Sequence, residues 1–256
     1  MPARLHIDRP LHAAETLTLP PRAARHVQVL RLQPGAPLIL FDGRGGEWSA
    51  TVRRMGRSEV EVEVGAHDSV ERELPCHVTL ALGMPANERM DSLIEKATEL
   101  GVAAIQPLHC ERSVLRLSAE RAQKKLEHWR GVAVAASEQS GRTQVPRIAE
   151  VMSLPGWLAA LGGADVGGTE RFVLSLREAT PFRPTAALER AVFLSGPEGG
   201  LSSAEEDAAR AAGFQAASLG PRVLRADTAP LAVLAAIGLA SKPDHSGRVP
   251  PRAQRL

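Results

Sequence analysis

The segment VFLSGPEGGLSSAE, residues 192–205, combines an apolar run with a glycine-rich turn and the start of a helix. Gly199 and Gly200 allow backbone angles that other residues avoid, and they leave no side chain in the way of a ligand. Ser202 and Glu205 have the spacing of a capping box, which predicts a helix directly after the turn. The segment is neither a P-loop nor a GxGxxG fingerprint. It can hold a ligand through backbone groups, although a plain connecting turn has the same composition.

A second glycine turn, LGPRVLRADTA at residues 219–229, also lies between a short apolar strand and an apolar helix. Gly220 and Pro221 define the turn, and Arg222 and Arg225 lie three residues apart. Guanidinium groups at that spacing can face one ligand or phosphate, but they can equally be solvated charges. Ligands of α/β proteins bind beyond the carboxyl ends of strands. The two turns are therefore the first candidates for a binding site.

A third polar segment, ASEQSGRT at residues 136–143, ends a predicted long helix at Gly141. Glu138 and Arg142 give it both charges, although ordinary helix capping explains the same residues. His26 could contact a base or a phosphate, but a lone histidine beside apolar residues is more often structural. The chain shows no Ser-His-Asp or Cys-His arrangement and no carboxylate pair typical of glycosidases.

The elements that must position these residues divide the chain into two parts. Residues 36–43, 47–55 and 58–64 alternate or run apolar around turn residues, which predicts a small β-barrel in the first 75 residues. After Cys76 the pattern changes to strands alternating with helices, which predicts an α/β domain with a mostly parallel sheet. The predicted strands of that domain are 77–82, 102–105, 172–176, 191–195 and 214–218. The predicted helices are 87–100, 118–137, 202–212 and 228–240.

Two details of this pattern are specific enough to test. Asn87 is predicted to cap the first helix of the α/β domain, and the strand 102–105 is predicted to stop at Pro107. Residues 162–168 are expected to form a flexible loop. The tail, residues 242–256, is rich in Pro, Arg and Ser and is expected to be disordered.

Composition bounds the function only loosely. Of the 31 basic residues in the 256-residue chain, 27 are Arg, and codon bias in a GC-rich genome explains most of this skew. The chain contains no Tyr. Residues 20–57 have a net charge of +5, 58–75 of −5 and 109–147 of +4, so local basic surfaces suited to a phosphate backbone are predicted. Two distant cysteines indicate no zinc site and no disulfide framework. Without a signal peptide or a membrane-length apolar run, we expect a cytoplasmic protein with no membrane partner.

The motifs together resemble one family. GMPANERMDSLIEKATELGV, ERSV, EQSGR, GPEGG and LGPRVLRADTA occur in the order found in the RsmE family of 16S ribosomal RNA methyltransferases, which modify N3 of a uridine. HVQVLRLQPG and LFDGRG resemble the PUA-like barrel that opens that family, and the resemblance spans about residues 4–240. It implies a PUA-like RNA-binding β-barrel over residues 1–73 and a SPOUT α/β domain with a trefoil knot over 74–241, before the tail 242–256.

The resemblance also implies S-adenosyl-L-methionine as cofactor, 16S rRNA or the small ribosomal subunit as partner, a homodimer and no metal. Carried over by position, the cofactor-binding residues are Leu176, Ser195, Gly196, Gly199, Gly200, Leu219, Gly220, Val223 and Leu224. Arg225 is the first candidate to stabilise the charge that develops on the uracil, and Glu198, Glu138 and Arg142 are weaker catalytic candidates. The predicted RNA-binding residues are Arg22, Arg25, His26, Arg31, Arg112, Arg142 and Arg222. A SPOUT enzyme for another rRNA or tRNA position, or a non-catalytic RNA-binding protein, are the alternatives.

Overall fold

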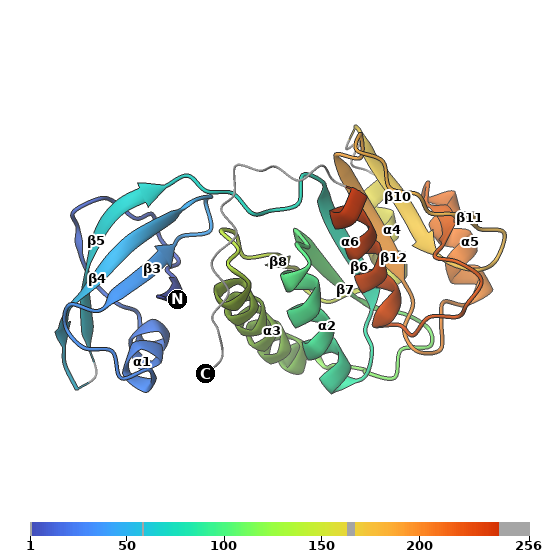
Figure 1. The fold of residues 1–256 in the computed structure, drawn as a ribbon. Coiled ribbons are helices and arrows are strands. Elements are labelled where there is room, and N and C mark those ends of the chain that lie inside the picture. Colours follow the sequence, from blue (N-terminus) through green and yellow to red (C-terminus); the bar gives the residue numbers. More distant parts are fainter. Residues whose placement is uncertain (1, 58, 163–166, 241–256) are drawn as a thin grey trace. The chain divides into compact units, whose positions relative to one another are not determined.

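The structure of the chain, a computed structural model, describes residues 2–57, 59–162 and 167–240 (Figure 1). The predicted tail and residues 163–166 of the predicted flexible loop lie outside the described residues. The chain forms two compact units. The first contains the residues up to Glu73 together with Ser137–Val145, and the second contains Leu74–Ala136 and the described residues from Pro146 onwards.

The first unit is built on a five-stranded mixed sheet in the order β1-β3-β4-β5-β2. The strands are β1 (Ala3–His6), β2 (Thr16–Thr18), β3 (Pro37–Phe41), β4 (Glu47–Met55) and β5 (Val60–Asp68), and the helix α1 spans Pro21–Val29. β1 runs parallel to β3, and the other neighbouring strands are antiparallel. Val60, Val62 and Val64 of β5 are buried, because alternate residues of a strand face the same side.

The local charges of the first unit partly cancel across the sheet. Arg53 pairs with Glu63, and Arg54 donates to Glu61 with nitrogen–oxygen distances of 3.0 and 2.6 Å. β4 and β5 are hydrogen-bonded neighbours, so the acidic stretch after residue 58 neutralises the end of the basic stretch before it. The first unit also exposes Arg22 and Arg25 on α1 and Arg31 beyond its end.

The second unit contains an eight-stranded sheet whose pairings are all parallel. Its order is β11-β13-β10-β12-β6-β7-β8, with β9 also paired to β7. The strands are β6 (His77–Gly83), β7 (Ala104–His109), β8 (Arg147–Ile148), β9 (Met152–Ser153), β10 (Thr169–Leu174), β11 (Thr180–Pro181), β12 (Arg190–Ser195) and β13 (Gln215–Ser218). The helices are α2 (Asn87–Glu99), α3 (Ala119–Ser140), α4 (Leu154–Gly162), α5 (Ser203–Ala211) and α6 (Thr228–Ala240).

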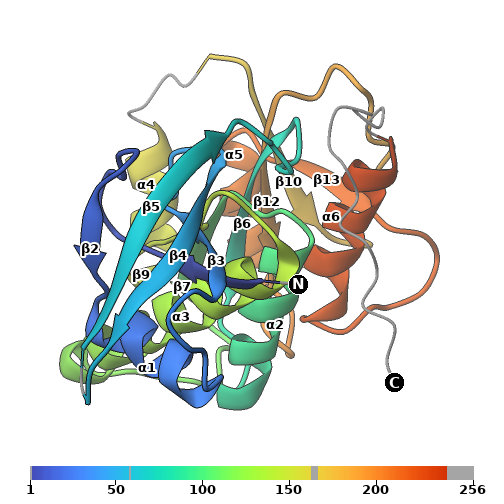
Figure 2. The same cartoon turned by 60° about the vertical axis from the view of Figure 1, so that its left-hand side comes forward.

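The helices cover this sheet in two groups. α2 and α6 pack against each other, with α6 contacting β12, whereas α4 and α5 pack together on the other face (Figures 1 and 2). Leu194 of β12 faces the core formed with Trp157 and Phe214, and the preceding Phe193 faces away from that core and stacks on Phe172. This arrangement confirms the predicted α/β domain with a parallel sheet, while the trefoil knot stays a prediction.

Two details differ from the sequence predictions. β7 does not stop at Pro107 but continues through it, paired with Leu82 of β6. On its other side, β7 pairs with β8 at Ala104 and Ile105 and with β9 at Leu108 and His109, so the missing N–H of the proline falls between two short partner strands.

The start of α2 also differs. Ala86, and not Asn87, is the N-cap of α2, and no side chain of its own caps this helix. By contrast, the predicted capping box of α5 is confirmed: the Ser202 hydroxyl accepts from the N–H of Glu205, and the Glu205 carboxylate accepts from the N–H of Ser202.

Candidate active site

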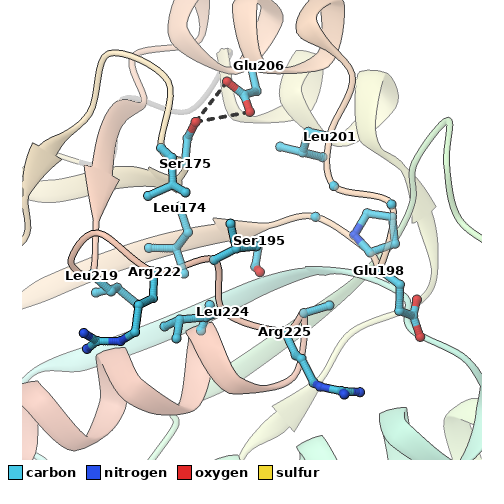
Figure 3. A pocket seen from close by; sticks show the side chains of 18 of the residues that line it. Leu174, Ser175, Ser195, Glu198, Leu201, Glu206, Leu219, Arg222, Leu224 and Arg225 are labelled. Atoms are coloured by element: carbon cyan, nitrogen blue, oxygen red, sulfur yellow. Dashed lines mark hydrogen bonds between the residues drawn. The ribbon is translucent and has the colours of Figure 1, made fainter.

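A pocket of about 610 Å³ lies in the second unit, where β10, β12 and β13 reach their carboxyl ends (Figure 3). The chain passes from β10 to β12 on one side and then from β12 to β13 on the other side of β10. Such a reversal of strand order opens a crevice between the loops at the ends of the strands. The pocket has the size of a small-molecule site. It is lined by Arg89, Leu174, Ser175, Leu176, Ser195, Gly196, Pro197, Glu198, Gly199, Gly200, Leu201, Glu206, Ala217, Leu219, Arg222, Val223, Leu224, Arg225, Ala226 and Ala229.

The first glycine turn closes tightly on itself after β12. A Cβ atom on Gly196 would lie 2.6 Å from the nitrogen of Leu201 and 2.8 Å from the carbonyl carbon of Gly200. Gly200 has φ +68°, a conformation that favours glycine. The turn also lies against β6, since a Cβ on Gly83 would meet the Pro197 ring at 2.5 Å. The absence of side chains at these positions is what allows the turn to form this wall of the pocket.

Two side chains from other segments hold the first turn in place. Arg112 donates to the carbonyl of Gly199 at 3.0 Å and to that of Leu201 at 3.3 Å. The Glu198 carboxylate accepts from the N–H of Ala86 at 3.0 Å and lies 3.6 Å from the Arg89 guanidinium. Glu198, a predicted catalytic residue, therefore also completes the N-terminus of α2, and Arg112, predicted to bind RNA, contacts the backbone of the pocket wall.

The second glycine turn forms the opposite wall and is far more exposed. Gly220 has φ +107°, and the side chains of Arg222, Val223 and Arg225 are exposed, Val223 at 85%. Among the described residues, the side chains of Arg222 and Arg225 have no hydrogen-bonding or ionic partner. Their guanidinium groups are therefore free to meet a ligand or a substrate.

The third wall follows β10 and contains a polar pair. The Ser175 hydroxyl lies 3.2 and 3.1 Å from the two carboxylate oxygens of Glu206, to which it donates its proton. The same hydroxyl accepts from the N–H of Arg177 at 2.9 Å. Leu174 lines the pocket beside this pair, and Leu176, half exposed, lies after it.

The structure brings most of the predicted site residues together. The predicted cofactor-binding residues line the pocket, with the exception of Gly220, which shapes the turn beside it. Arg225, Glu198 and Arg222 line it as well. Sequence reasoning missed Leu174, Ser175, Glu206 and Arg89. Glu206 directly follows the capping box, within the first turn of α5. Its closeness in the sequence to the first glycine turn was the signal that could have found it.

Glu138 and Arg142 lie in the first unit and do not line the pocket. Glu138 accepts from the N–H of His6 at 3.0 Å, and its other oxygen lies 4.0 Å from Nδ1 of His26. Arg142 is buried, with Nε donating to Glu73 at 2.9 Å. These contacts favour a structural role for Arg142, whereas the half-buried His26 and the exposed Arg22, Arg25 and Arg31 remain accessible.

Neither cysteine is a plausible nucleophile. Burial, helped by the nearby charge of Glu205, raises the pKa of the Cys110 thiol to about 12, although a hydrogen bond with Ser113 opposes the shift. Burial, with a contribution from Glu170, raises the pKa of Cys76 to about 11. In the part of the chain that the structure describes, no three His, Cys, Asp or Glu residues are grouped to hold a metal ion. No helix in the same part has the length and apolarity to cross a bilayer.

Comparisons with known proteins define the class of this fold and site. Residues 72–238 match the model of an RNA methyltransferase domain, and residues 19–65 match the model of an RNA methyltransferase PUA domain. The methyltransferase match covers the described part of the second unit up to residue 238 and also includes Ser137–Val145 of the first unit, and the PUA match lies within the first unit.

Individual relatives narrow the class further. The ribosomal RNA small subunit methyltransferase E of Bacillus subtilis is 32% identical over 89% of this chain and 91% of that protein. The enzyme of the same name from Synechocystis is 35% identical over 87% of this chain and 72% of the relative. Among solved structures, methyltransferase E from Neisseria gonorrhoeae bound to S-adenosyl methionine has a TM-score of 0.86 and 34% identity, covering 94% of this chain and 98% of that one. The chain belongs to the family of ribosomal RNA small subunit methyltransferases E.

Proposed function

We propose that the chain methylates N3 of a uridine in 16S ribosomal RNA, with S-adenosyl-L-methionine as methyl donor. The observation that carries this proposal is the pocket between the two glycine turns, in a chain that belongs to the methyltransferase E family. The relatives from N. gonorrhoeae and Legionella pneumophila were solved with S-adenosyl methionine bound. The small-subunit substrate follows from the names of the relatives, and the uridine N3 position follows from the RsmE resemblance.

The pocket has the chemistry that this cofactor needs. Leu174, Leu219 and Leu224 offer apolar surface for a flat base, and the glycine turn 196–200 allows close approach of backbone hydrogen-bonding groups. Arg89 and Glu198 offer both charges to an amino-acid end. Bound here, S-adenosyl-L-methionine supplies a methyl group made electrophilic by its sulfonium.

Arg225 is the residue that we propose to promote the reaction directly. The N3 of uridine carries a proton and becomes nucleophilic when that proton leaves, which places negative charge on the uracil ring and its carbonyls. A guanidinium that has no protein partner can stabilise that charge. Of the predicted catalytic carboxylates, Glu198 lines the pocket and is the candidate to accept the N3 proton. One of its oxygens already accepts a hydrogen bond from the N–H of Ala86.

RNA binding is proposed to involve both units. Residues 1–73 would hold rRNA through Arg22, Arg25, His26 and Arg31, and the domain 74–241 would carry the methyl transfer. Arg222 at the rim of the pocket would bind phosphate near the target base. The proposal also includes a cytoplasmic homodimer and the trefoil knot of the SPOUT class. The exposure of Val223 and of Leu239, which is 89% exposed on α6, is compatible with a partner subunit.

The decisive experiment incubates the protein with methyl-labelled cofactor and, in separate reactions, free 16S rRNA, assembled small subunits or tRNA. Mass mapping of the digested RNA then locates the label. A single methylated uridine that resists Watson–Crick pairing at N3 supports the proposal. A label in tRNA or at another base assigns the chain to a different target, and cofactor binding by calorimetry without any label, or no binding at all, contradicts the enzyme activity proposed here.

A further inference from the structure

Glu206 lines the pocket, and its carboxylate accepts a hydrogen bond from the Ser175 hydroxyl. Its two oxygens lie 3.2 and 3.1 Å from the Ser175 hydroxyl, and Glu206 itself lies within the first turn of α5. Ser175 is in turn oriented by the N–H of Arg177, which donates to its oxygen at 2.9 Å. A carboxylate has about four acceptor positions, and the serine uses one of them. The pair therefore presents a fixed acceptor to the pocket.

The position of this pair separates it from the other charged groups of the pocket. Figure 3 shows Glu206 and Ser175 together at one side, with Arg222, Arg225 and Glu198 around the other. Among the described residues, Glu206 forms no ion pair. The guanidinium of the nearby Arg177 pairs instead with the neighbouring Asp207, at a nitrogen–oxygen distance of 2.9 Å. The pocket thus has a side with both signs of charge and a second side with a carboxylate and a hydroxyl.

We propose that Glu206, oriented by Ser175, binds the ribose hydroxyls of the cofactor. This inference rests on the proposed function and names the part of the cofactor that each side of the pocket recognises. The amino-acid end of S-adenosyl-L-methionine carries an ammonium and a carboxylate on one carbon, so it requires the side with both charges, where Glu198 and Arg89 lie. The vicinal hydroxyls of ribose are neutral donors, and the two carboxylate oxygens can accept one hydrogen bond from each. Acidic residues bind ribose hydroxyls in this way in dinucleotide sites.

This assignment makes Glu206 a specificity-determining residue. A ligand without ribose hydroxyls would leave the carboxylate desolvated with the Ser175 hydroxyl as its donor but none from the ligand, which costs affinity. The chain should therefore distinguish ribose from dideoxyribose ligands, and the distinction should depend on Glu206. The glycine turn 196–200 would bind both ligands alike, because its backbone groups are the same in either case.

The test measures binding and not turnover. S-adenosylhomocysteine and its analogue lacking both ribose hydroxyls are titrated calorimetrically into the wild-type chain, Glu206→Gln and Asp207→Asn. We expect the wild type to bind the analogue at least about tenfold more weakly than S-adenosylhomocysteine, because the analogue cannot donate hydrogen bonds to the charged carboxylate. Glu206→Gln should bind S-adenosylhomocysteine about tenfold more weakly and should distinguish the two ligands by no more than about twofold. Asp207→Asn removes a neighbouring charge from the same helix and should behave as wild type.

The outcomes that overturn the inference are distinct from failure of the proposed function. Equal weakening of both ligands by Glu206→Gln would assign Glu206 to another group of the cofactor, and unchanged binding of both would remove it from the site. Glu206→Ala and a thermal unfolding curve for each variant distinguish a lost contact from a lost fold. A wild-type chain that binds neither ligand would instead refute the proposed cofactor itself, and this inference with it.

Discussion

The two glycine turns line the same pocket but are held in opposite ways. The turn 196–201 is fixed by Arg112 and by the bond from Ala86 to Glu198, and its backbone closes on itself at Gly196. The turn 219–225 has exposed side chains at Arg222, Val223 and Arg225. A wall fixed before the ligand arrives loses little conformational entropy on binding, whereas exposed side chains lose rotamer freedom when a partner orders them.

This contrast divides the work of the site. The fixed turn, held by bonds that exist without a ligand, is suited to binding the cofactor. The exposed turn adds Leu219 and Leu224 to the cofactor pocket, but its unpaired guanidinium groups are suited to meeting the RNA and to acting on it. Variants of the fixed turn and of these guanidinium groups should therefore affect different measurements, and the predictions below test this division.

The largest effect is expected for Arg225→Ala on the exposed turn. Loss of the guanidinium removes stabilisation of the negative charge on uracil, so the single-turnover methylation rate should fall by about 10²–10³. Cofactor affinity measured by calorimetry should stay within about twofold. Arg222→Ala is the matched control and should weaken RNA binding while keeping the rate at saturating RNA. Lost cofactor binding with a normal rate in Arg225→Ala would reverse the division of the two turns.

Gly196→Ala should have the next largest effect, this time on binding. Its Cβ would lie 2.6 Å from a backbone nitrogen and 2.8 Å from a backbone carbon, so the turn itself has to move. Overpacking of this kind costs about 3 kcal/mol, or roughly a hundredfold in cofactor affinity. Calorimetric titration of cofactor, with thermal unfolding as a check of the fold, measures the effect.

Gly220→Ala provides the comparison on the exposed turn. Gly220 has a positive φ of +107°, unlike Gly196, but nothing lies within 4 Å of its added Cβ. The substitution strains the backbone without a collision and should cost at most about tenfold in cofactor affinity. Equal losses for the two alanine variants would show that the fixed and exposed turns contribute alike.

Arg112→Ala should loosen the fixed turn without obstructing it. The carbonyls of Gly199 and Leu201 would lose a charged donor, which water partly replaces, so cofactor affinity should fall about tenfold. Arg112→Lys should recover part of the loss, and Arg116→Ala, an exposed arginine of the same segment, should leave the affinity unchanged. If Arg112→Ala weakened RNA binding alone, the arginine would belong to the RNA surface, as its sequence context predicts.

Local patterns predicted the frame of this site well. The capping box at Ser202 and Glu205 and the strands that end in the two turns depend on residues close in the chain, and the structure contains them. Pro107 shows where local reasoning fails. Its tolerance inside β7 depends on a gap between β8 and β9, and these two strands follow in the chain only after the long helix α3.

The polar partners of the site could not be predicted for the same reason. Arg142 looked available for catalysis, but it is buried against Glu73, which lies 69 residues earlier. Glu206 looked like an ordinary helix residue, because nothing near it indicates that Ser175 and the pocket lie opposite. Periodicity shows which face of a helix is polar, but it does not show what that face meets.

The smallest predicted effect uses Cys110 to report movement of the fixed turn. Its buried thiol lies behind this turn, 3.0 Å from the point where a Cβ on Gly83 would stand, and the same point meets Pro197. Its pKa of about 12 lies above the usual value, so thiolate is scarce at pH 8 and alkylation by iodoacetamide should be slow. Each unit of pH below that pKa should change the rate about tenfold, upward as the pH rises.

Loosening the turn should expose this thiol more often. Arg112→Ala should accelerate alkylation of Cys110 about threefold, a change that mass spectrometry of the peptides resolves. Cys76, also buried but with a pKa of about 11, is the internal reference, because it precedes β6, whereas the fixed turn meets Gly83 at the other end of that strand. Saturating S-adenosylhomocysteine should slow Cys110 in the wild type and leave Cys76 unaffected. Equal acceleration of both cysteines would indicate global unfolding, and the fixed turn would then have no local stability of its own to contrast with the exposed one.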